Sequence, residues 1–382
     1  MAGTIPADMT VQQWDDQYFE DFVNKDWWKK FTSTGSDSMI CTKEELIDKP
    51  GTKIHIPLVN ELSSAALGEN DLYEGNEKSM TLRDFPIEVH EYGLPVKYKN
   101  FEAKKTAVEL REVYKSGLRT WNMKLQRDKI LAAMHSVYDS NGITYKFSND
   151  GDANKFSNLP IAPNAVRDQW LVWNSDRVLF GAALSNNTGN MVTSLANVSN
   201  ATGKITPDLV DQMKFIGEHP GAGKPRIKPL MPRTDIDEQH GFVLFVDDLL
   251  LRDIRANTAF QTANREARLR GIDNPIFSGA NYIYNNVAIY SIPEFAPLKG
   301  VGAAAADVGR ACLCGAQAIG TVWGKRPWTV DKKLDYDRFS GMAIMQWYEV
   351  EKLRWGTDPA SDKGSPVDHG IVHGFFNASA YA

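Results

Sequence analysis

Residues 51–62 have the sequence GTKIHIPLVNEL, in which the apolar Ile54, Ile56 and Leu58 alternate with polar side chains. A period of two is typical of a strand that buries one face. Pro57 has no backbone N–H to donate to a neighbouring strand, so it favours a position at the edge of a sheet. This stretch therefore predicts an extended edge strand, and its pairing partner decides the fold.

A second extended run, residues 85–98, also alternates apolar and polar side chains, and we expect the two runs to form one long hairpin. Twelve residues of strand at ~3.3 Å each would reach roughly 40 Å. The polar segment between them, residues 63–80, has few sizeable apolar side chains beyond Leu67, Leu72 and Tyr73. Because this loop gains little from burying its own side chains, we predict that these three contact a neighbouring subunit.

Residues 103–138 contain no proline and carry apolar side chains at helical spacing. The apolar stripe consists of Ala107, Leu110, Tyr114, Leu118, Trp121, Leu125, Leu131, Ala132 and Met134. At 1.5 Å per residue, a single helix over this range would be about 54 Å long. We therefore predict one long helix that serves as a structural spine.

Residues 9–31 carry aromatic side chains at helical spacing with acidic residues between them, which predicts an amphipathic helix. Thr10 and Gln13 have the spacing of a capping box at its start. Such a helix packs either on its own domain or on a neighbouring subunit. We favour the second interpretation, in which the intersubunit contact is made by Trp14, Tyr18, Phe22 and Trp27.

The rest of the chain mixes helices and strands without the regular alternation that builds a parallel sheet. Residues 139–205 are rich in Asn, Ser, Gly and Thr and predict a loop-rich insertion with short strands. Asn285-Asn286 is a strong signal for a two-residue hairpin. The fold class is therefore α+β, with helices predicted at 207–216, 249–270 and 310–322 and strands at 241–246, 282–284, 287–292, 342–355 and 370–377.

The composition, 42% hydrophobic and 24% charged residues, is that of an ordinary globular protein. At about 150 residues per domain, a chain of 382 residues predicts two to three structural units. With 43 Lys and Arg against 48 Asp and Glu, the net charge of −5 excludes a protein that binds nucleic acid through a basic surface. Three cysteines fit a reducing compartment. We expect no secretory signal and no membrane span, because the longest apolar stretches, such as 178–184, are far shorter than ~18 residues.

The residues that could carry chemistry form no recognisable catalytic constellation. The run GAGK at 221–224 lacks the earlier glycine and the following Ser or Thr of a phosphate-binding loop. Cys312 and Cys314 are predicted on a helix, as buried thiols rather than zinc ligands. His369 and His373 would share one face of a strand, which leaves a metal-ligand pair as an alternative. We expect no catalytic residue, no cofactor and no metal ligand.

Six segments, taken together and in their order along the chain, resemble one protein family. They are GTKIHIPLVNEL (51–62), LYEGNEKSMTL (72–82), IFSGANYIYNNVAIYSIP (276–293), RACLCGAQAIG (310–320), KLDYDRFSGMAIMQWYEVEKLRWG (333–356) and DHGIVHGFF (368–376). Over roughly residues 10–378, the chain resembles the major capsid proteins of tailed bacteriophages, which have the Hong Kong 97-like coat-protein fold.

The resemblance implies a structural protein that assembles with itself, as hexamers and pentamers, into an icosahedral shell around double-stranded DNA without sequence-specific contacts. Portal, scaffolding and cementing proteins would be its other partners. Assembly would take place in the bacterial cytoplasm, and the virion capsid would be its final location. The implied parts are an N-terminal arm (1–50), an extended hairpin loop (51–101), a spine helix of the peripheral domain (102–141), an axial domain with a loop-rich insertion (142–325) and C-terminal strands of the peripheral domain (326–382).

Two other classes of function stay open. A virion accessory or tail protein would form a small ring in place of a closed shell. A metal-dependent hydrolase would use His369 and His373 as ligands and would contain a stoichiometric metal ion. Images of the particles, together with a test for loss of activity in a His373→Ala variant, distinguish these alternatives.

Overall fold

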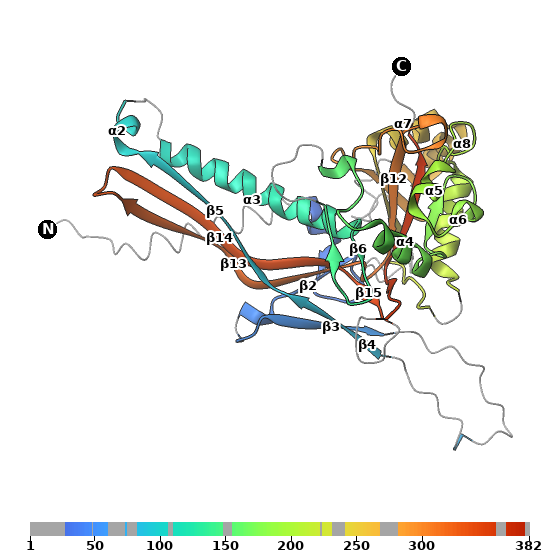
Figure 1. Ribbon diagram of the computed structural model, residues 1–382, viewed down its shortest axis with the longest axis horizontal. Helices are drawn as coiled ribbons and strands as arrows, with labels where there is room; N and C mark the ends of the chain where they lie inside the picture. The colour runs from blue at the N-terminus through green and yellow to red at the C-terminus, as the bar shows by residue number, and fades with distance from the viewer. Residues whose placement is uncertain are drawn as a thin grey trace.

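The structure is a computed structural model, and it describes residues 27–47, 49–59, 73–74, 82–105, 110–147, 155–221, 224–230, 241–267, 282–356 and 364–378. Two sheets dominate these residues, one in a long arm and the other in a globular body (Figure 1). Predictions that concern residues 1–26 and 60–72 lie outside the described part of the chain.

The first sheet consists, in spatial order, of β1 (Thr32–Ser33), β2 (Ile40–Lys43), β13 (Ile319–Leu334), β14 (Phe339–Lys352) and β5 (His90–Lys99). The second consists of β10 (Tyr282–Tyr284), β11 (Val287–Ser291), β9 (Phe242–Val246), β12 (Val308–Cys314), β17 (Ile371–Asn377) and β8 (Val178–Phe180). Smaller pairs are β3 (Lys53–Val59) with β4 (Leu82–Glu88), β6 (Val137–Tyr138) with β7 (Thr144–Tyr145), and β15 (Arg354–Trp355) with β16 (Val367–Asp368).

The α-helices are α2 (Asn100–Ala103), α3 (Leu110–Met134), α4 (Asn164–Trp173), α5 (Met191–Ala196), α6 (Pro207–Glu218), α7 (Asp248–Ala256) and α8 (Thr258–Ala267). Short 3₁₀ helices are η1 (Trp27–Phe31), η2 (Glu45–Ile47), η3 (Lys155–Ser157), η4 (Leu184–Asn186) and η5 (Ala303–Ala305).

The arm is built from the hairpin of β13 and β14, with β5 antiparallel to the other edge of β14 and α3 lying along the sheet (Figure 1). Leu118 of α3 packs on Met342 and Ile344 of β14, which fixes the helix to the sheet. The predicted spine helix is confirmed, but it is shorter than expected. It has 25 residues, or about 38 Å. Residues 100–103 form the separate helix α2, and the backbone after Met134 turns toward β6.

The predicted hairpin of residues 51–62 is confirmed in part. β3 pairs with β4 in antiparallel register from Lys53↔Glu88 to Val59↔Leu82, and its apolar face packs on Leu353 and Trp355. The prediction of one continuous strand over 85–98 is wrong, because β5 leaves this hairpin and pairs with β14. The sequence carries the reason: buried side chains fall on odd positions through Ile87, whereas Leu94 and Val96 pack on the arm from even positions.

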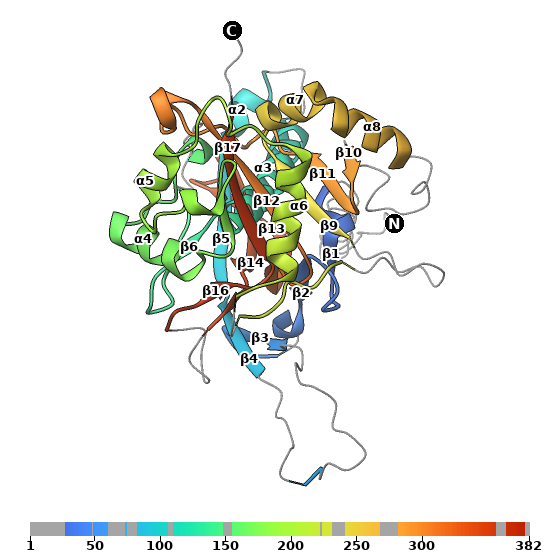
Figure 2. The ribbon, with the colours of Figure 1, turned by 90° about the vertical axis from the view of Figure 1, so that its right-hand side faces the viewer.

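The central strands of the body are buried on both faces, and every residue of β9, β12 and β17 is buried. Helices α6 and α7 cover one face through Met213 and Leu250, and Figure 2 shows α6 lying across β12 and β17. The opposite face packs on η1 and on the end of α3, where Phe31 and Met134 belong to the same cluster as Phe245.

Three further predictions for the body need correction. Residues 310–322 are not a helix but the end of β12 and the start of β13, because a strand buried on both faces has the same continuous apolar pattern as a buried helix. The predicted helix 249–270 is divided at Asn257 into α7 and α8. The region 139–205 contains α4 and α5 besides its loops and short strands.

The Asn285-Asn286 hairpin between β10 and β11 is confirmed. Both residues have left-handed backbone conformations, with φ values of 43° and 61°, which asparagine tolerates better than most residues. The buried strand predicted at 241–246 and the helix that begins at Pro207 are also present, as β9 and α6.

Candidate intersubunit surfaces

The far end of the arm exposes large apolar side chains. Tyr336, in the turn between β13 and β14, is 102% exposed, and Phe101 of α2 is 62% exposed. The Asn100 side chain donates a hydrogen bond to the backbone oxygen of Asp337 at 2.6 Å, so α2 and this turn share one end of the arm. Gathered apolar groups of this kind are typical of a protein–protein contact surface. We call this surface the arm tip; it consists of Phe101, Val330, Leu334 and Tyr336.

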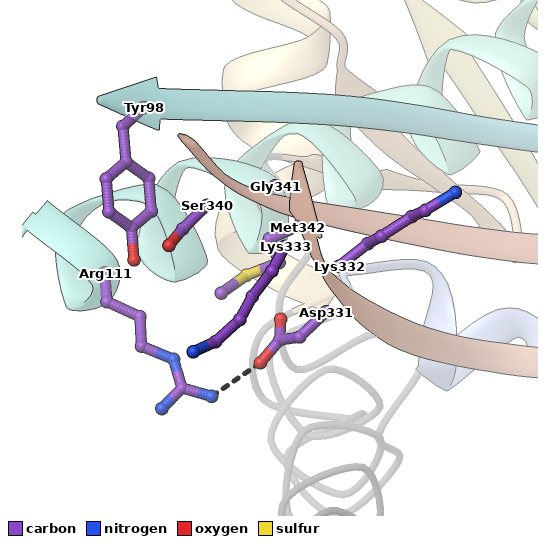
Figure 3. Close-up of a pocket in the computed structure, with 8 residues that line it drawn as sticks. All are labelled: Tyr98, Arg111, Asp331, Lys332, Lys333, Ser340, Gly341 and Met342. Atoms are coloured by element: carbon purple, nitrogen blue, oxygen red, sulfur yellow. Dashed lines mark hydrogen bonds and ion pairs between the residues drawn. The ribbon is translucent and has the colours of Figure 1, made fainter. Parts of the chain in front are cut away.

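A cavity of about 490 Å³ lies beside the arm tip, between α3, β5, β13 and β14 (Figure 3). Arg111 Nη2 of α3 donates to Asp331 Oδ2 of β13 at 2.6 Å and thereby joins the helix to the hairpin. Both side chains are about half exposed, so the ion pair stabilises the fold by about 1 kcal/mol or less. The cavity is lined by Tyr98, Arg111, Asp331, Lys332, Lys333, Ser340, Gly341 and Met342. Because this lining has three basic residues and one acidic residue, it attracts acidic groups.

A second cavity, of about 340 Å³, lies where the β3–β4 hairpin meets the first sheet, and its lining includes Leu46, Val89 and Trp347. The Trp347 ring is 41% exposed and meets the Trp328 ring edge to face at 5.6 Å. The root of the hairpin therefore presents apolar surface that a neighbouring chain can cover.

A buried ion cluster joins the helix of the arm to the sheet of the arm. Glu349 of β14 accepts hydrogen bonds from Lys129 of α3 at 3.1 Å and from Lys146 at 2.8 Å. The Tyr92 hydroxyl of β5 also donates to Glu349, at 2.6 Å. Burial alone would raise the pKa of Glu349, but Lys146 and Lys129 outweigh burial and lower the pKa to about 2. The carboxylate therefore stays charged and holds α3, β5 and β14 together.

A second buried network surrounds Asp368. Its Oδ2 accepts from Lys352 Nζ at 2.9 Å and from His373 Nε2 at 3.0 Å, and its Oδ1 accepts from the Tyr138 hydroxyl at 2.9 Å. Lys352 also donates to the backbone oxygen of Ser136, just after α3, at 2.7 Å. Burial alone would raise the pKa of Asp368, but Lys352 and His373 lower it well below its usual value. The network ties the end of α3 to the strands of the body.

Most of the intersubunit residues predicted from the sequence lie outside the described part of the chain. This applies to Trp14, Tyr18, Phe22, Leu67 and Leu72 and to the side chain of Trp27, so their role remains a prediction. Tyr73 is described, and it is 72% exposed. The sequence reasoning missed Phe101 and Tyr336, although an aromatic residue in a polar turn such as LDYDR is a readable signal.

The predicted pairing of His369 with His373 on one strand face is wrong. His369 precedes β17 and stacks on Trp355, and burial lowers its pKa to about 3. His373 lies on β17 and faces Cys312 and Asp368 instead. Cys312 and Cys314 are buried thiols, as expected, but they lie on a strand rather than on a helix. The pair on which a metal-dependent hydrolase would depend is therefore not formed.

None of the helices in the described part of the chain is long and apolar enough to cross a bilayer.

The chain matches the phage capsid protein family over residues 6–373. The major capsid protein of Pseudomonas phage KPP25 is 24% identical to it over 378 residues, which cover 94% of this chain and 93% of that protein. Among solved structures, the capsid asymmetric unit of cyanophage Pam1 has a TM-score of 0.75 and 24% identity, over 93% of this chain and 92% of that chain. The capsid of Ralstonia phage GP4 has a TM-score of 0.70 and 16% sequence identity, over 94% of this chain and 92% of that chain.

The two solved structures share this chain's arrangement of helices and sheets, which confirms the α+β coat-protein fold expected from the sequence. The family match spans both the arm and the body. The chain therefore belongs to the phage capsid protein family, and it is a structural component of a bacteriophage capsid.

Proposed function

We propose that the chain is the major subunit of a tailed-phage capsid, which assembles with itself as hexamers and pentamers into an icosahedral shell around double-stranded DNA. The arm carries this proposal, because it projects from the body (Figure 1) and its end exposes apolar side chains. A solitary protein gains nothing from an apolar surface at the end of an arm, whereas a subunit buries such a surface against its neighbour.

The division into parts follows from the two sheets. We assign the spine helix α3 and the β13–β14 hairpin to a peripheral domain, the six-stranded sheet with helices α4 to α8 to an axial domain, and β3 with β4 to the base of an extended hairpin loop. The expected division assigns residues 326–382 to the peripheral domain. We assign strand β17, which lies in this range, to the axial domain, because it pairs with β12 in the body.

The net charge of −5 supports a shell that encloses DNA without binding it tightly, because tight contacts with DNA phosphates need a basic surface. We further propose that assembly takes place in the bacterial cytoplasm and involves portal, scaffolding or cementing proteins. The protein acts by packing against copies of itself, without catalysis.

Expression of the full chain in bacteria, followed by electron microscopy over a range of salt and protein concentrations, tests this function. We expect closed shells, or hexamers and pentamers that close into shells as the concentration rises. A small ring of fixed size would point to a tail or accessory protein instead. A protein that stays monomeric under every condition would contradict the proposal.

A further inference from the structure

Three side chains with metal-binding atoms meet in the core from distant parts of the sequence. His135 follows directly after α3, Cys312 lies on β12, and His373 lies on β17. Cys312 and His373 are direct cross-strand partners, which places their side chains on one face of the sheet. All three residues are buried, with exposed fractions of 7%, 0% and 2% in chain order.

The distances from the Cys312 sulfur to the two histidines match those around a tetrahedral zinc ion. Cys312 Sγ lies 3.5 Å from His373 Nδ1, and it lies 3.6 Å from Nε2 and 3.7 Å from Nδ1 of His135. Because both nitrogens of the His135 ring are about equally far from the sulfur, this ring has to turn to direct one of them at the ion. Zn–S bonds of about 2.3 Å and Zn–N bonds of about 2.0–2.1 Å at tetrahedral angles place sulfur and nitrogen about 3.6 Å apart. The ligand atoms of all three residues lie within 4.8 Å of one another. Two nitrogens bound to one zinc ion at tetrahedral angles lie about 3.3 Å apart, so one ion binds both histidines once the His135 ring turns toward His373.

The groups behind this cluster orient His373 for metal binding. Asp368 Oδ2 accepts the His373 Nε2 proton at 3.0 Å, which leaves the Nδ1 lone pair directed toward Cys312. A carboxylate that orients the ligating histidine is the usual outer partner of a metal site.

The nearby cations Arg310 and Lys352 act in two directions. They oppose a divalent cation by charge repulsion. Burial raises the pKa of the Cys312 thiol to about 12, and Lys352 and Arg310 offset only part of this rise, so a zinc ion has to displace the thiol proton. The carboxylate of Asp368, at 2.9 Å from Lys352 Nζ, offsets part of the repulsion. A set of one sulfur and two imidazole nitrogens selects zinc over calcium or magnesium, which prefer oxygen ligands.

We propose that His135, Cys312 and His373 bind one zinc ion in the core of the subunit. Binding forms one Zn–S and two Zn–N bonds, and the Cys312 thiol proton leaves to solvent. Zinc usually takes four ligands, so a water molecule would hold the position that these three side chains leave open. The ion would fasten the end of the arm helix α3 to strands β12 and β17 of the body.

Metal analysis of purified full-length protein, expressed in zinc-supplemented medium, tests the site directly. The matched controls are Cys314→Ala, which removes a second buried thiol two residues along the same strand, and His369→Ala, which removes a second buried histidine near β17. We expect about one zinc ion per chain in the unchanged protein and in both controls. The Cys312→Ala and His373→Ala variants should each contain at least about ten-fold less zinc per chain than the unchanged protein.

Refolding the protein with cobalt(II) in place of zinc adds a spectroscopic readout. Cobalt bound by a thiolate gives a charge-transfer absorption that Cys312→Ala should abolish and Cys314→Ala should retain. Absence of stoichiometric metal from the unchanged protein, together with no cobalt–thiolate absorption, would overturn the proposal. Equal loss of metal from Cys312→Ala and Cys314→Ala would do the same. The measurement is made on subunits, so it does not depend on whether they form shells.

Discussion

Replacing Glu349 with glutamine tests whether the buried ion cluster holds helix α3 on the sheet of the arm. The substitution keeps the size of the side chain but removes its charge. Lys129, whose side chain is 5% exposed, loses the carboxylate that it contacts at 3.1 Å. Lys146 retains Glu351 at 2.7 Å. The substitution therefore weakens mainly the contact between α3 and β14.

Two pKa shifts set the expected magnitude. Burial alone would raise the pKa of Glu349, but its lysine partners lower it from 4.5 to about 2, which corresponds to about 3 kcal/mol. Burial lowers the pKa of Lys129 from 10.5 to about 8, an unfavourable contribution of similar size. The intact pair is therefore close to neutral for stability, whereas Glu349→Gln should lower the free energy of unfolding by about 3 kcal/mol.

Urea denaturation of the unassembled subunit at neutral pH, followed by circular dichroism, measures this loss. The double variant Glu349→Gln with Lys129→Met should recover most of it, because no charge then stays buried without a partner. Asp331→Asn is the control, since it removes a carboxylate from a half-exposed ion pair with Arg111 and should cost less than about 1 kcal/mol.

The same carboxylate predicts a pH dependence. The pKa of Glu349 in the folded state, about 2, lies below its ordinary value of 4.5, so its stabilisation is complete above about pH 4.5 and is lost as the pH falls toward 2. Glu349→Gln should lack this part of the acid destabilisation. Equal losses in Glu349→Gln and Asp331→Asn, or no recovery in the double variant, would refute this reasoning.

Three further predictions concern the body, the arm tip and the hairpin loop. Asp247 caps α7 through Leu250 at 2.7 Å, and burial raises its pKa from 3.8 to about 6. Stability should therefore fall as the pH rises through this range, and Asp247→Asn should remove the fall in thermal melts at a series of pH values. Phe101→Ser combined with Tyr336→Ser should leave the melting temperature within a few degrees of the unchanged protein but reduce shell yield in sedimentation assays, because both side chains are exposed in the subunit. Replacing residues 63–80 with Asn-Gly should give a soluble, cooperatively melting subunit that forms no stable shells; heat-resistant particles from this variant would show that the loop is not an intersubunit contact.

The sequence predicts correctly those elements that depend on a few neighbouring residues. The alternation in β3 and the Asn285-Asn286 turn are properties of a few consecutive residues, and both were predicted correctly. β12 was misread because a strand buried on both faces has no period of two. The apolar phase changes after Ile87 and marks the division between β4 and β5, although the alternation over 85–98 alone predicts one strand.

The two buried networks could not be predicted, because their members meet only through long-range topology. Lys129 and Glu349 are 220 residues apart, and Tyr138 and Asp368 are 230 residues apart. No spacing rule links such positions in a single sequence. Pairing of β12 with β17, and the packing of α3 against β14, bring them together.

A reconstruction of the assembled shell by electron cryomicroscopy, at a resolution that shows side chains, tests most directly the claim that the arm joins copies of this chain. We predict that Tyr336 and Phe101 lie buried against a neighbouring subunit in each hexamer or between hexamers. A closed shell in which the arm tip of every subunit faces solvent would contradict the claim.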